Sequence, residues 1–433
     1  MLIPRKLLDK LSNSLKPKKV LMLVGPRQVG KTSLIKQCLD NLHGEKRMDL
    51  NGDFLADRET LLKKSKIEFE NLIGDSSLLF IDEAQKFENI NLTLKILVDN
   101  FPDLKIIVSG SAAFELMSKV RESLAGRLIK LNLFPIAQLE LSKIESRRET
   151  QENLFRRMIY GSYPEVITLK TDKEREEYLY NFVEAFLFKD IFEYEGIKNS
   201  IKIKRLLQLL ALQLGQEVSL SEIGSQLSMD KETVARYLDL LEKTFVIYER
   251  VGFSSGSLRK EISKTKRYYF YDNGVRNVLI NNMNSLEIRS GKEIGQLWES
   301  YIITERLKYL NYSEELPRQN SYFWRTYNQS EIDLVEQGGV CEQSHNLNAY
   351  EIKWTGKPSL DGTARKRASS RLRRTNDRSV LKVHEDHEDD ENAEIGVCEQ
   401  SLEPPSEWRK LYPQASFLQV NRDNYLEFIG ADF

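Results

Sequence analysis

Residues 25–32 read Gly-Pro-Arg-Gln-Val-Gly-Lys-Thr, and this octapeptide is the strongest indication of the architecture of the N-terminal part of the chain. It follows an apolar run, VLMLV at 20–24, and precedes TSLIKQCLDNL, which has helical spacing. Strand, glycine-rich loop and helix in that order are the context of a phosphate-binding P-loop. Glycines let backbone N–H groups turn inward around a phosphate, and the following helix adds the positive end of its dipole.

The loop predicts a site for ATP and Mg²⁺. Lys31 would place a positive charge on the terminal phosphates, and Thr32 would offer its hydroxyl to the Mg²⁺. The residues expected to bind the nucleotide are Gly25, Pro26, Arg27, Gln28, Val29, Gly30, Lys31, Thr32 and Ser33.

A second apolar run, LLFI at 78–81, ends in two acids, Asp82 and Glu83. We expect this strand to lie beside the P-loop strand in a parallel sheet, with its carboxyl end facing the phosphates. Asp82 would then hold the Mg²⁺ through water. Glu83 would polarise the attacking water as a general base.

A third run, KIIVS at 105–109, ends in Ser109. We expect Ser109 to touch the γ-phosphate or to orient water, with Ser111 as the alternative; a simple turn is nearly as good an interpretation. Arg127, in preference to Arg121, is the candidate arginine for the γ-phosphate, supplied in cis or by a neighbouring subunit. The alternative for Arg127 is an ordinary surface arginine.

The chain has 433 residues, which at about 150 residues per domain predicts roughly three domains. Apolar strands separated by helices indicate a parallel α/β sheet in the N-terminal part. Further on, three helices with a tight turn before the last, and then a hairpin, indicate a winged helix-turn-helix in which Asp230 caps the last helix. The predicted units are a P-loop domain over residues 1–140, a helical lid or connector over 141–200, a winged helix-turn-helix over 201–280, and an α/β domain with a mixed sheet over 285–433.

Two stretches of the last unit need separate interpretation. LEFI at 426–429 has the composition of a strand. Residues 356–407 contain a basic block followed by an acidic block and few apolar residues, a pattern typical of solvated, disordered chain. The string GVCEQS occurs at 339–344 and again at 396–401, so a duplication or insertion in the coding sequence is one hypothesis.

The winged helix could contact duplex DNA. The predicted second helix, KETVARYLDLLEKT, has acids among its outward residues, which weighs against tight docking in the major groove. The hairpin loop is more basic and could sit on the DNA backbone through Arg259, Lys260, Lys264, Lys266 and Arg267. A winged helix used only for domain packing is an equal alternative.

GPRQVGKT, LLFIDEAQ and SLAGR together resemble prokaryotic AAA+ superfamily ATPases that are fused to a C-terminal region classed as a domain of unknown function. The resemblance continues through GSYPEV at 161–166 and KRYYFYDNGVRN at 266–277, and resumes at EIDLV and YEIKW. The charged segment departs from that pattern. The resemblance implies an architecture and an ATPase more than a pathway.

The last unit resembles the PD-(D/E)XK core of restriction-endonuclease-like folds, with Glu299, Asp333, Glu351 and Lys353 at its motif positions. Asp333 and Glu351 would bind a metal that activates water, Lys353 would stabilise the developing charge, and Glu299 would complete the site. The sequence departs from the core at Glu331, where Pro-Asp is frequent. A degenerate nuclease used for binding or assembly is the alternative.

Composition limits the remaining possibilities. The N-terminus lacks the apolar core of a signal peptide, and no stretch approaches the ~18 apolar residues of a membrane span. Three cysteines without close pairing indicate a reducing, cytoplasmic compartment. We therefore expect a cytoplasmic Mg²⁺-dependent ATPase that drives a DNA-binding or nuclease-like region, with a homo-oligomer as one option for its assembly. The alternatives are a regulatory switch with a partner-binding C-terminal domain and a defective mobile-element protein.

Overall fold

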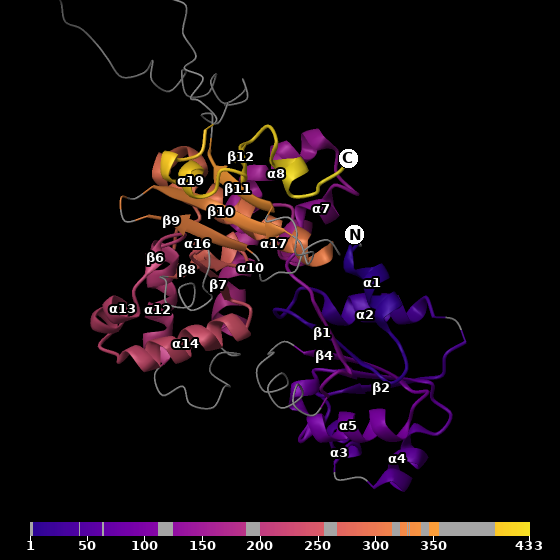
Figure 1. The fold of residues 1–433 in the computed structure, drawn as a ribbon. Helices are drawn as coiled ribbons and strands as arrows, with labels where there is room; N and C mark the ends of the chain where they lie inside the picture. The colour runs from indigo at the N-terminus through magenta and orange to yellow at the C-terminus, as the bar shows by residue number, and fades with distance from the viewer. Residues whose placement is uncertain are drawn as a thin grey trace, which may run out of the picture.

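The computed structural model describes residues 3–42, 44–62, 65–110, 124–187, 200–254, 266–313, 321–326, 328, 330–338, 346–354 and 403–433. Its described strands form three sheets of five, four and three strands. The five-stranded sheet lies at one end of the molecule and the four-stranded sheet at the other, with the three-stranded sheet and several helices between them (Figure 1). Nearly all of the charged segment, and both copies of GVCEQS, lie outside the described residues.

The N-terminal sheet is parallel, in the order β2-β3-β4-β1-β5. Helices α1 and α2 cover one face, and α3, α4 and α5 lie on the other (Figure 1). Every residue of β1 and β3 is buried, which agrees with the unbroken apolar runs that predicted them. The elements are α1 (Leu7–Ser14), β1 (Val20–Val24), α2 (Lys31–Asp40), β2 (Arg47–Asn51), α3 (Leu55–Thr60), α4 (Lys66–Ile73), β3 (Leu78–Asp82), α5 (Ile90–Asn100), β4 (Lys105–Gly110) and β5 (Leu128–Asn132).

The expected adjacency of the P-loop strand and the acidic strand is wrong. Strand β1 pairs with β4 and β5, and β3 pairs with β2 and β4, so β4 separates β1 from β3. Strands β2 and β5 at the two edges were not predicted. Their sequences, RMDLN and LIKLN, are mostly half-exposed or exposed and lack a continuous apolar run.

The middle part begins with helices whose first turns are fixed by their own side chains. Ser146 and Glu149 form a capping box at α8, and Thr171 and Glu174 form another at α10. The described helices here are α7 (Gln138–Leu141), α8 (Arg147–Tyr160), α9 (Pro164–Thr168) and α10 (Asp172–Phe182), with a π-helical turn at Val183–Leu187.

The rest of the middle part contains α12 (Ser200–Leu212), β6 (Glu217–Val218), α13 (Leu220–Leu227), α14 (Lys231–Lys243), β7 (Ile247–Val251), β8 (Lys266–Phe270) and α16 (Asn273–Leu279). The strands form an antiparallel sheet in the order β6-β8-β7. The prediction that Asp230 caps α14 is confirmed, because its carboxylate accepts from Thr233 N at 2.6 Å. The hairpin loop 255–265, with Arg259, Lys260 and Lys264, lies outside the described residues.

The C-terminal sheet is mixed and has the order β12-β11-β10-β9, with only β11 and β12 parallel. Its elements are α17 (Gly291–Tyr312), β9 (Ser321–Arg325), β10 (Glu331–Gly338), β11 (Asn346–Ile352), α19 (Ser406–Leu411), β12 (Ser416–Val420) and α20 (Tyr425–Phe428). The strand predicted at 426–429 is wrong. Tyr425, Phe428 and Ile429 are buried at helical spacing, and a short apolar run cannot by itself distinguish helix from strand.

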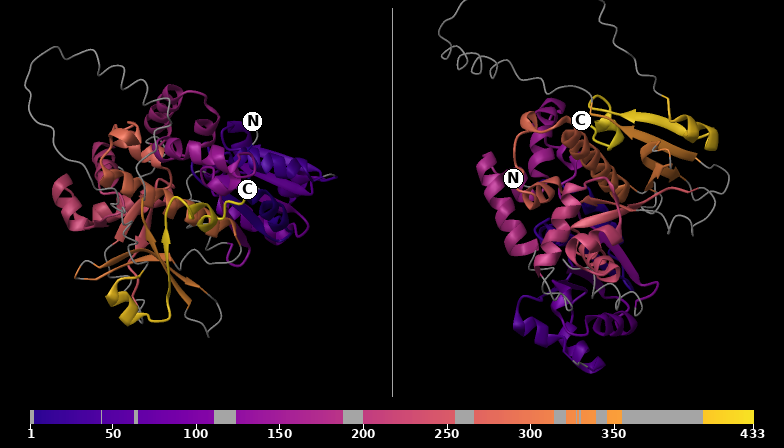
Figure 2. Two further views of the ribbon diagram at one scale, coloured as in Figure 1. Left: turned by 90° about the horizontal axis from the view of Figure 1, so that it is seen from above. Right: turned by 90° about the vertical axis from the view of Figure 1, so that its left-hand side faces the viewer.

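The three parts are joined by specific contacts. Gly252, just after β7, forms a parallel bridge with Phe323 of β9, so the middle sheet runs into the C-terminal sheet. Phe134, just after β5, stacks on Tyr271 of the middle part, with ring centroids 5.5 Å apart. The further views show the middle helices lying between the two end sheets (Figure 2). Within the described residues, no helix is long and apolar enough to span a membrane.

Candidate functional site

The loop between β1 and α2 has the conformation that its glycines allow. Gly30 has φ 92° and Gln28 has φ 60°, both in the left-handed region. A Cβ atom on Gly25 would lie 2.1 Å from the backbone oxygen of Leu133, so any larger residue would force the loop away from the strand end. The first glycine of the motif is therefore required by packing, and Gly30 by its backbone angle.

The Lys31 side chain is folded back into the loop. It is buried, and its Nζ donates to the carbonyl oxygens of Gly25 at 3.0 Å and Pro26 at 2.8 Å. The ammonium group thus lies inside the ring of backbone that is predicted to surround a phosphate.

Three residues from separate elements meet beside the loop. Thr32 Oγ1 donates to Asp82 Oδ2 at 2.8 Å, and Ser109 donates its hydroxyl to Asp82 Oδ1. The backbone N–H of Glu83 also donates to Asp82 Oδ1, at 3.1 Å. The hydroxyl of Thr32 and the carboxylate of Asp82 are the hard oxygen ligands that Mg²⁺ prefers, so the residues present fit this ion.

Glu83 lies next to this cluster in an unusual backbone conformation. Its φ is 48° and its ψ is 47°, in the left-handed region that non-glycine residues seldom adopt. Gln85 Nε2 donates to its carboxylate at 2.5 Å. The sequence pointed to Glu83 but not to Gln85, whose side-chain amide holds the Glu83 carboxylate.

Arg127 lies at the other end of the sheet. Its backbone oxygen accepts from Val20 N at the amino end of β1, whereas the P-loop follows the carboxyl end. Five residues of strand separate the two ends, about 16 Å at 3.3 Å per residue. Its guanidinium pairs with Asp99. The in-cis role predicted for Arg127 is therefore wrong. Ser111 and Arg121 lie outside the described residues.

Arg5 holds the P-loop from behind, and no sequence motif pointed to it. Its guanidinium donates to Val29 O at 2.8 Å, to Phe134 O at 2.7 Å and to Glu140 at 3.0 Å. It therefore ties the back of the P-loop to the chain that follows β5. No local pattern could have revealed this, because its side-chain partners lie 24 to 135 residues away.

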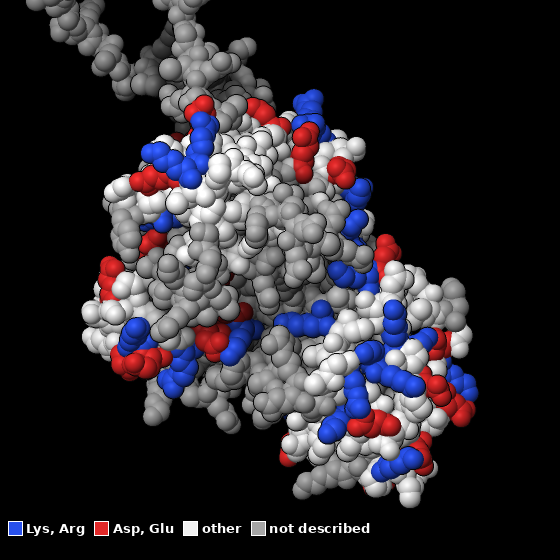
Figure 3. Space-filling view, in the orientation of Figure 1, with Lys and Arg blue, Asp and Glu red and all other residues white. Residues whose placement is uncertain are grey.

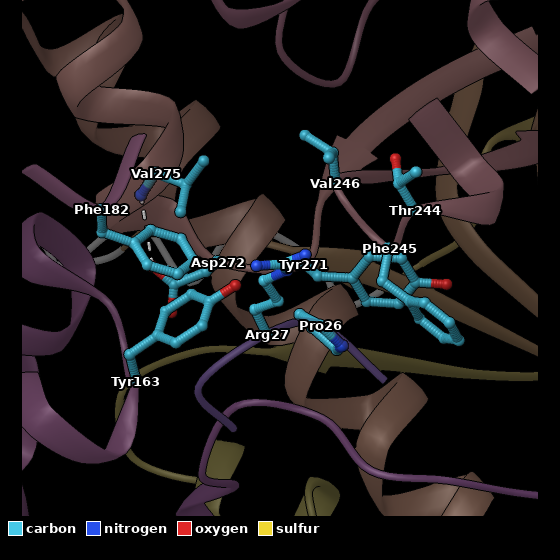
Figure 4. Close-up of a pocket in the computed structure, with 10 residues that line it drawn as sticks. All are labelled: Pro26, Arg27, Tyr163, Phe182, Thr244, Phe245, Val246, Tyr271, Asp272 and Val275. Atoms are coloured by element: carbon cyan, nitrogen blue, oxygen red, sulfur yellow. Dashed lines mark hydrogen bonds between the residues drawn. The ribbon is translucent and has the colours of Figure 1, made fainter. Parts of the chain in front are cut away.

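The tip of the P-loop also forms one wall of a pocket in the middle part. Pro26 and Arg27 face aromatic rings, with Tyr163 and Phe182 on one side and Phe245 on the other (Figure 4). Beyond this pocket, Tyr178 of α10 donates its hydroxyl hydrogen to Gln28 Oε1 at 2.6 Å. The loop therefore contacts the middle part directly through three successive residues, Pro26, Arg27 and Gln28.

The four residues predicted for a nuclease site come together at the C-terminal sheet. Asp333 Oδ2 accepts from Ile352 N at 2.7 Å, across the β10–β11 pair. Lys353 Nζ lies 2.5 Å from Glu351 Oε1. Glu299 Oε1, on α17, accepts from the hydroxyl of Tyr269 at 2.7 Å. Burial raises the pKa of Asp333 well above its usual range, and the negative charges of Glu299 and Glu351 raise it further.

These acids do not form a preformed metal site. Among the residues that the structure describes, no three His, Cys, Asp or Glu side chains are placed to hold one ion. Glu299 is instead drawn toward the middle part, where Arg267 Nη1 lies 4.0 Å from it. Asp333 and Glu351 were predicted to bind a metal, but in this conformation no third described His, Cys, Asp or Glu side chain is placed to complete such a site.

A parallel sheet with a glycine-rich loop after its β1 strand, a lysine inside that loop and an acid at a nearby strand end defines a P-loop protein. Residues 17–142 match the family model described as "AAA domain". Residues 151–286 match "Domain of unknown function (DUF8612)", and residues 294–396 match "Domain of unknown function (DUF4143)".

Similar proteins are described only as uncharacterized. One from Mycobacterium tuberculosis is 27% identical over 347 residues, covering 80% of this chain and 73% of its own length. One from Haemophilus influenzae is 25% identical, covering 59% of this chain and 68% of its own. A solved DNA replication initiation factor shares 17% identity over 55% of this chain and 85% of its own, with a TM-score of 0.25. That score carries no argument about fold or function.

Proposed function

We propose that this chain is a Mg²⁺-dependent ATPase whose AAA domain acts on its own middle and C-terminal parts. The observation that carries the proposal is the contact between Thr32 and Asp82 beside the loop that holds Lys31. Thr32 and Asp82 would hold the Mg²⁺, which neutralises phosphate charge when it is bound. The chain's own contribution is a set of donors and acceptors fixed in place before the nucleotide arrives.

Lys31 supports the proposal through its present partners. Its ammonium group is held by two loop carbonyl oxygens, which are neutral acceptors. Phosphate oxygens are charged acceptors and form stronger hydrogen bonds with an ammonium group. An arriving triphosphate would therefore exchange weaker contacts for stronger ones without a large movement of the Lys31 side chain.

Glu83 is the proposed general base. Its backbone is held in a strained conformation, and Gln85 orients its carboxylate. Ser109 is proposed to position Asp82 rather than to touch phosphate, because its hydroxyl is donated to that carboxylate.

For the remainder of the chain, we propose the units 141–200, 201–280 and 285–433 as a connector, a winged helix and a restriction-endonuclease-like domain. The order α12, α13, α14 followed by the β7–β8 pair supports the winged helix. The surface supports domain packing more than DNA binding. Lys243 pairs with Asp239 on α14 at 2.6 Å, and acids and bases alternate there (Figure 3). Lys266 pairs with Glu249, and Arg267 is buried.

The rival candidate is a regulatory switch, in which nucleotide binding reorders the middle part and the C-terminal domain recruits a partner. The contact between Tyr178 and Gln28 favours it, because the nucleotide loop itself touches the middle part. ATP turnover measured with and without duplex DNA separates the two: stimulation supports a DNA partner, and no stimulation supports the switch.

The test of the ATPase uses the full chain with ATP and Mg²⁺. We expect Lys31→Ala to lose nucleotide affinity, and Glu83→Gln to retain ATP but not to hydrolyse it. Lys19→Ala is the matched control, because Lys19 also donates to a loop carbonyl oxygen, that of Gly126, but at the amino ends of β1 and β5, opposite to the P-loop. A wild-type chain that neither binds nor hydrolyses ATP at millimolar Mg²⁺ would disprove the proposal.

A further inference from the structure

The acidic cluster consists of Glu299, Glu331, Asp333 and Glu351, and it lies at the seam between the middle and C-terminal parts. Asp333 is buried, and the side chain of Glu299 is only 17% exposed. Burial is also the largest cause that raises the pKa of Glu299. Several carboxylates in such a place require positive charge close by, because unpaired buried charge is costly.

Arg267 supplies that charge from strand β8. Its side chain is 4% exposed, and its Nη2 lies 2.9 Å from Glu331 Oε2. Its Nη1 lies 4.0 Å from Glu299 Oε1. The guanidinium also stacks over the ring of Phe323, 4.3 Å from its centroid. One arginine therefore reaches two carboxylates and an aromatic face that all belong to the C-terminal part.

The cations that pair with the other acids of the cluster are more exposed than Arg267. Lys353 pairs with Glu351, and its side chain is 53% exposed. Arg325 Nε lies 3.9 Å from Glu331, with its side chain 32% exposed. Neither reaches Glu299 in the described contacts, whereas Arg267 and its strand neighbour Tyr269 both do.

Arg267 lies at the place where the middle sheet joins the C-terminal sheet. Phe323, over which it stacks, is the residue bridged by Gly252 where the middle sheet joins the C-terminal sheet. Phe253 N donates to Phe323 O at the same place, at 2.6 Å. The ion pairs thus reinforce a backbone joint between two sheets that are otherwise separate.

We propose that Arg267 is the built-in cation of Glu299 and Glu331: it holds Glu299 at the middle sheet, so that Glu299, Asp333 and Glu351 do not together surround one ion, and it locks the middle sheet to the C-terminal sheet. The cluster in this conformation is an ion-pair joint, and it is closed to metal-dependent chemistry while β8 stays in place. This inference does not depend on the proposed ATPase, and it assigns to Arg267 a role different from a contact with the DNA backbone.

The test measures the thermal unfolding midpoint of the full chain with and without Mn²⁺ as the probe ion, in the absence of nucleotide. The wild type should not respond to Mn²⁺ through the cluster. Arg267→Gln should unfold at a lower temperature and regain on the order of 5 °C when Mn²⁺ is added, because Glu299, once released from Arg267, can join Asp333 and Glu351 around the ion. Adding Asp333→Asn to that variant should abolish the recovery.

Arg250→Gln is the matched control. Arg250 is equally buried, on the neighbouring strand β7, but its guanidinium donates to the hydroxyl of Ser321 rather than to a carboxylate. Its loss should lower the midpoint without creating any response to Mn²⁺. An Arg267→Gln variant that ignores Mn²⁺, or a wild type that gains stability from Mn²⁺ in a manner that requires Asp333, would overturn the proposal.

A second variant covers the case in which Arg267→Gln does not fold. In Arg267→Gln, Glu299 is a buried carboxylate that has lost its cation. Adding Glu299→Gln removes that negative charge, so the double variant should fold and should have a higher unfolding midpoint than Arg267→Gln alone. Failure of the double variant to fold any better than Arg267→Gln would count against the charge-balance argument.

Discussion

Ser109, at the end of β4, donates its hydroxyl to Asp82 at the end of β3, and Thr32 donates to the other oxygen of the same carboxylate. This geometry exists because β4 lies between the P-loop strand and the acidic strand. Asp82 therefore reaches the P-loop across an intervening strand, and the residue at the end of that strand determines how the carboxylate is held.

Ser109→Ala should lower the rate of ATP hydrolysis with little change in ATP affinity. The variant removes one of the hydrogen bonds that fix Asp82, which is worth about 1 kcal/mol, so we expect kcat to decrease by about fivefold. Steady-state kinetics and nucleotide binding measure the two quantities separately. Ser142→Ala is the control, since that serine is buried but donates to Leu139 O outside the site. An unchanged kcat for Ser109→Ala would contradict the expected role.

Gly25→Ala adds only one methyl group but should destabilise the P-loop. The added Cβ would lie 2.1 Å from Leu133 O, a backbone atom that cannot move aside cheaply. We expect a loss of about 1–3 kcal/mol in the free energy of unfolding and loss of ATP binding. Gly295→Ala, on α17, is the matched control, because no atom lies within 4 Å of the Cβ it would gain. Equal behaviour of the two variants in chemical denaturation would argue against the tight packing of Gly25.

Tyr178→Phe should alter the nucleotide site although Tyr178 lies in the middle part. The change removes only the hydroxyl that donates to Gln28 Oε1. Since Gln28 is held at positive φ, losing this contact should free the loop tip and weaken ATP binding by about two- to tenfold. Tyr180→Phe on the same helix makes the same chemical change and should have no effect. Identical ATP affinities for the two variants would remove the case for coupling through this contact.

Arg127→Ala tests whether Arg127 is remote from the nucleotide, as its position at the amino end of β5 indicates. Because Arg127 lies at the amino end of β5 and pairs with Asp99, its removal should change ATP turnover by no more than about twofold. Turnover measured over a range of protein concentrations is the check. A loss of two orders of magnitude that appears only at high concentration would instead mean that Arg127 serves a neighbouring subunit.

The sequence was sufficient for features carried by consecutive residues. The apolar runs predicted β1, β3 and β4 within a residue of their bounds, and the spacing of the P-loop placed Lys31 and Thr32. The sequence was insufficient where a feature depends on a contact between residues that are far apart along the chain. Three features depend on which strands pair, and no local pattern encodes strand pairing. They are the position of β4 between β1 and β3, the end of the sheet at which Arg127 lies, and the burial of Arg267.

Glu242 gives a pH dependence that can be measured on the folded chain. Burial, reinforced by the charge of Glu249, raises the pKa of the Glu242 carboxyl from 4.5 to about 8. The folded chain therefore binds this proton more tightly than the unfolded chain. The contribution to stability is complete below about pH 4.5 and is lost as the pH rises toward 8.

Glu242→Gln should remove that loss, because an amide does not ionise. Compared with the wild type, the variant should be nearly equal in free energy of unfolding at pH 5 and more stable at pH 8.5, by an amount on the order of a few kcal/mol. Denaturant titrations across this range measure the difference between the two chains, which cancels the contributions of other groups. Glu232→Gln makes the same substitution at an exposed position of the same helix and is the matched control. If the difference in free energy of unfolding between Glu242→Gln and the wild type does not change with pH, the Glu242 carboxyl is solvated in the folded chain. The contact between α14 and the middle sheet would then have to be open to water.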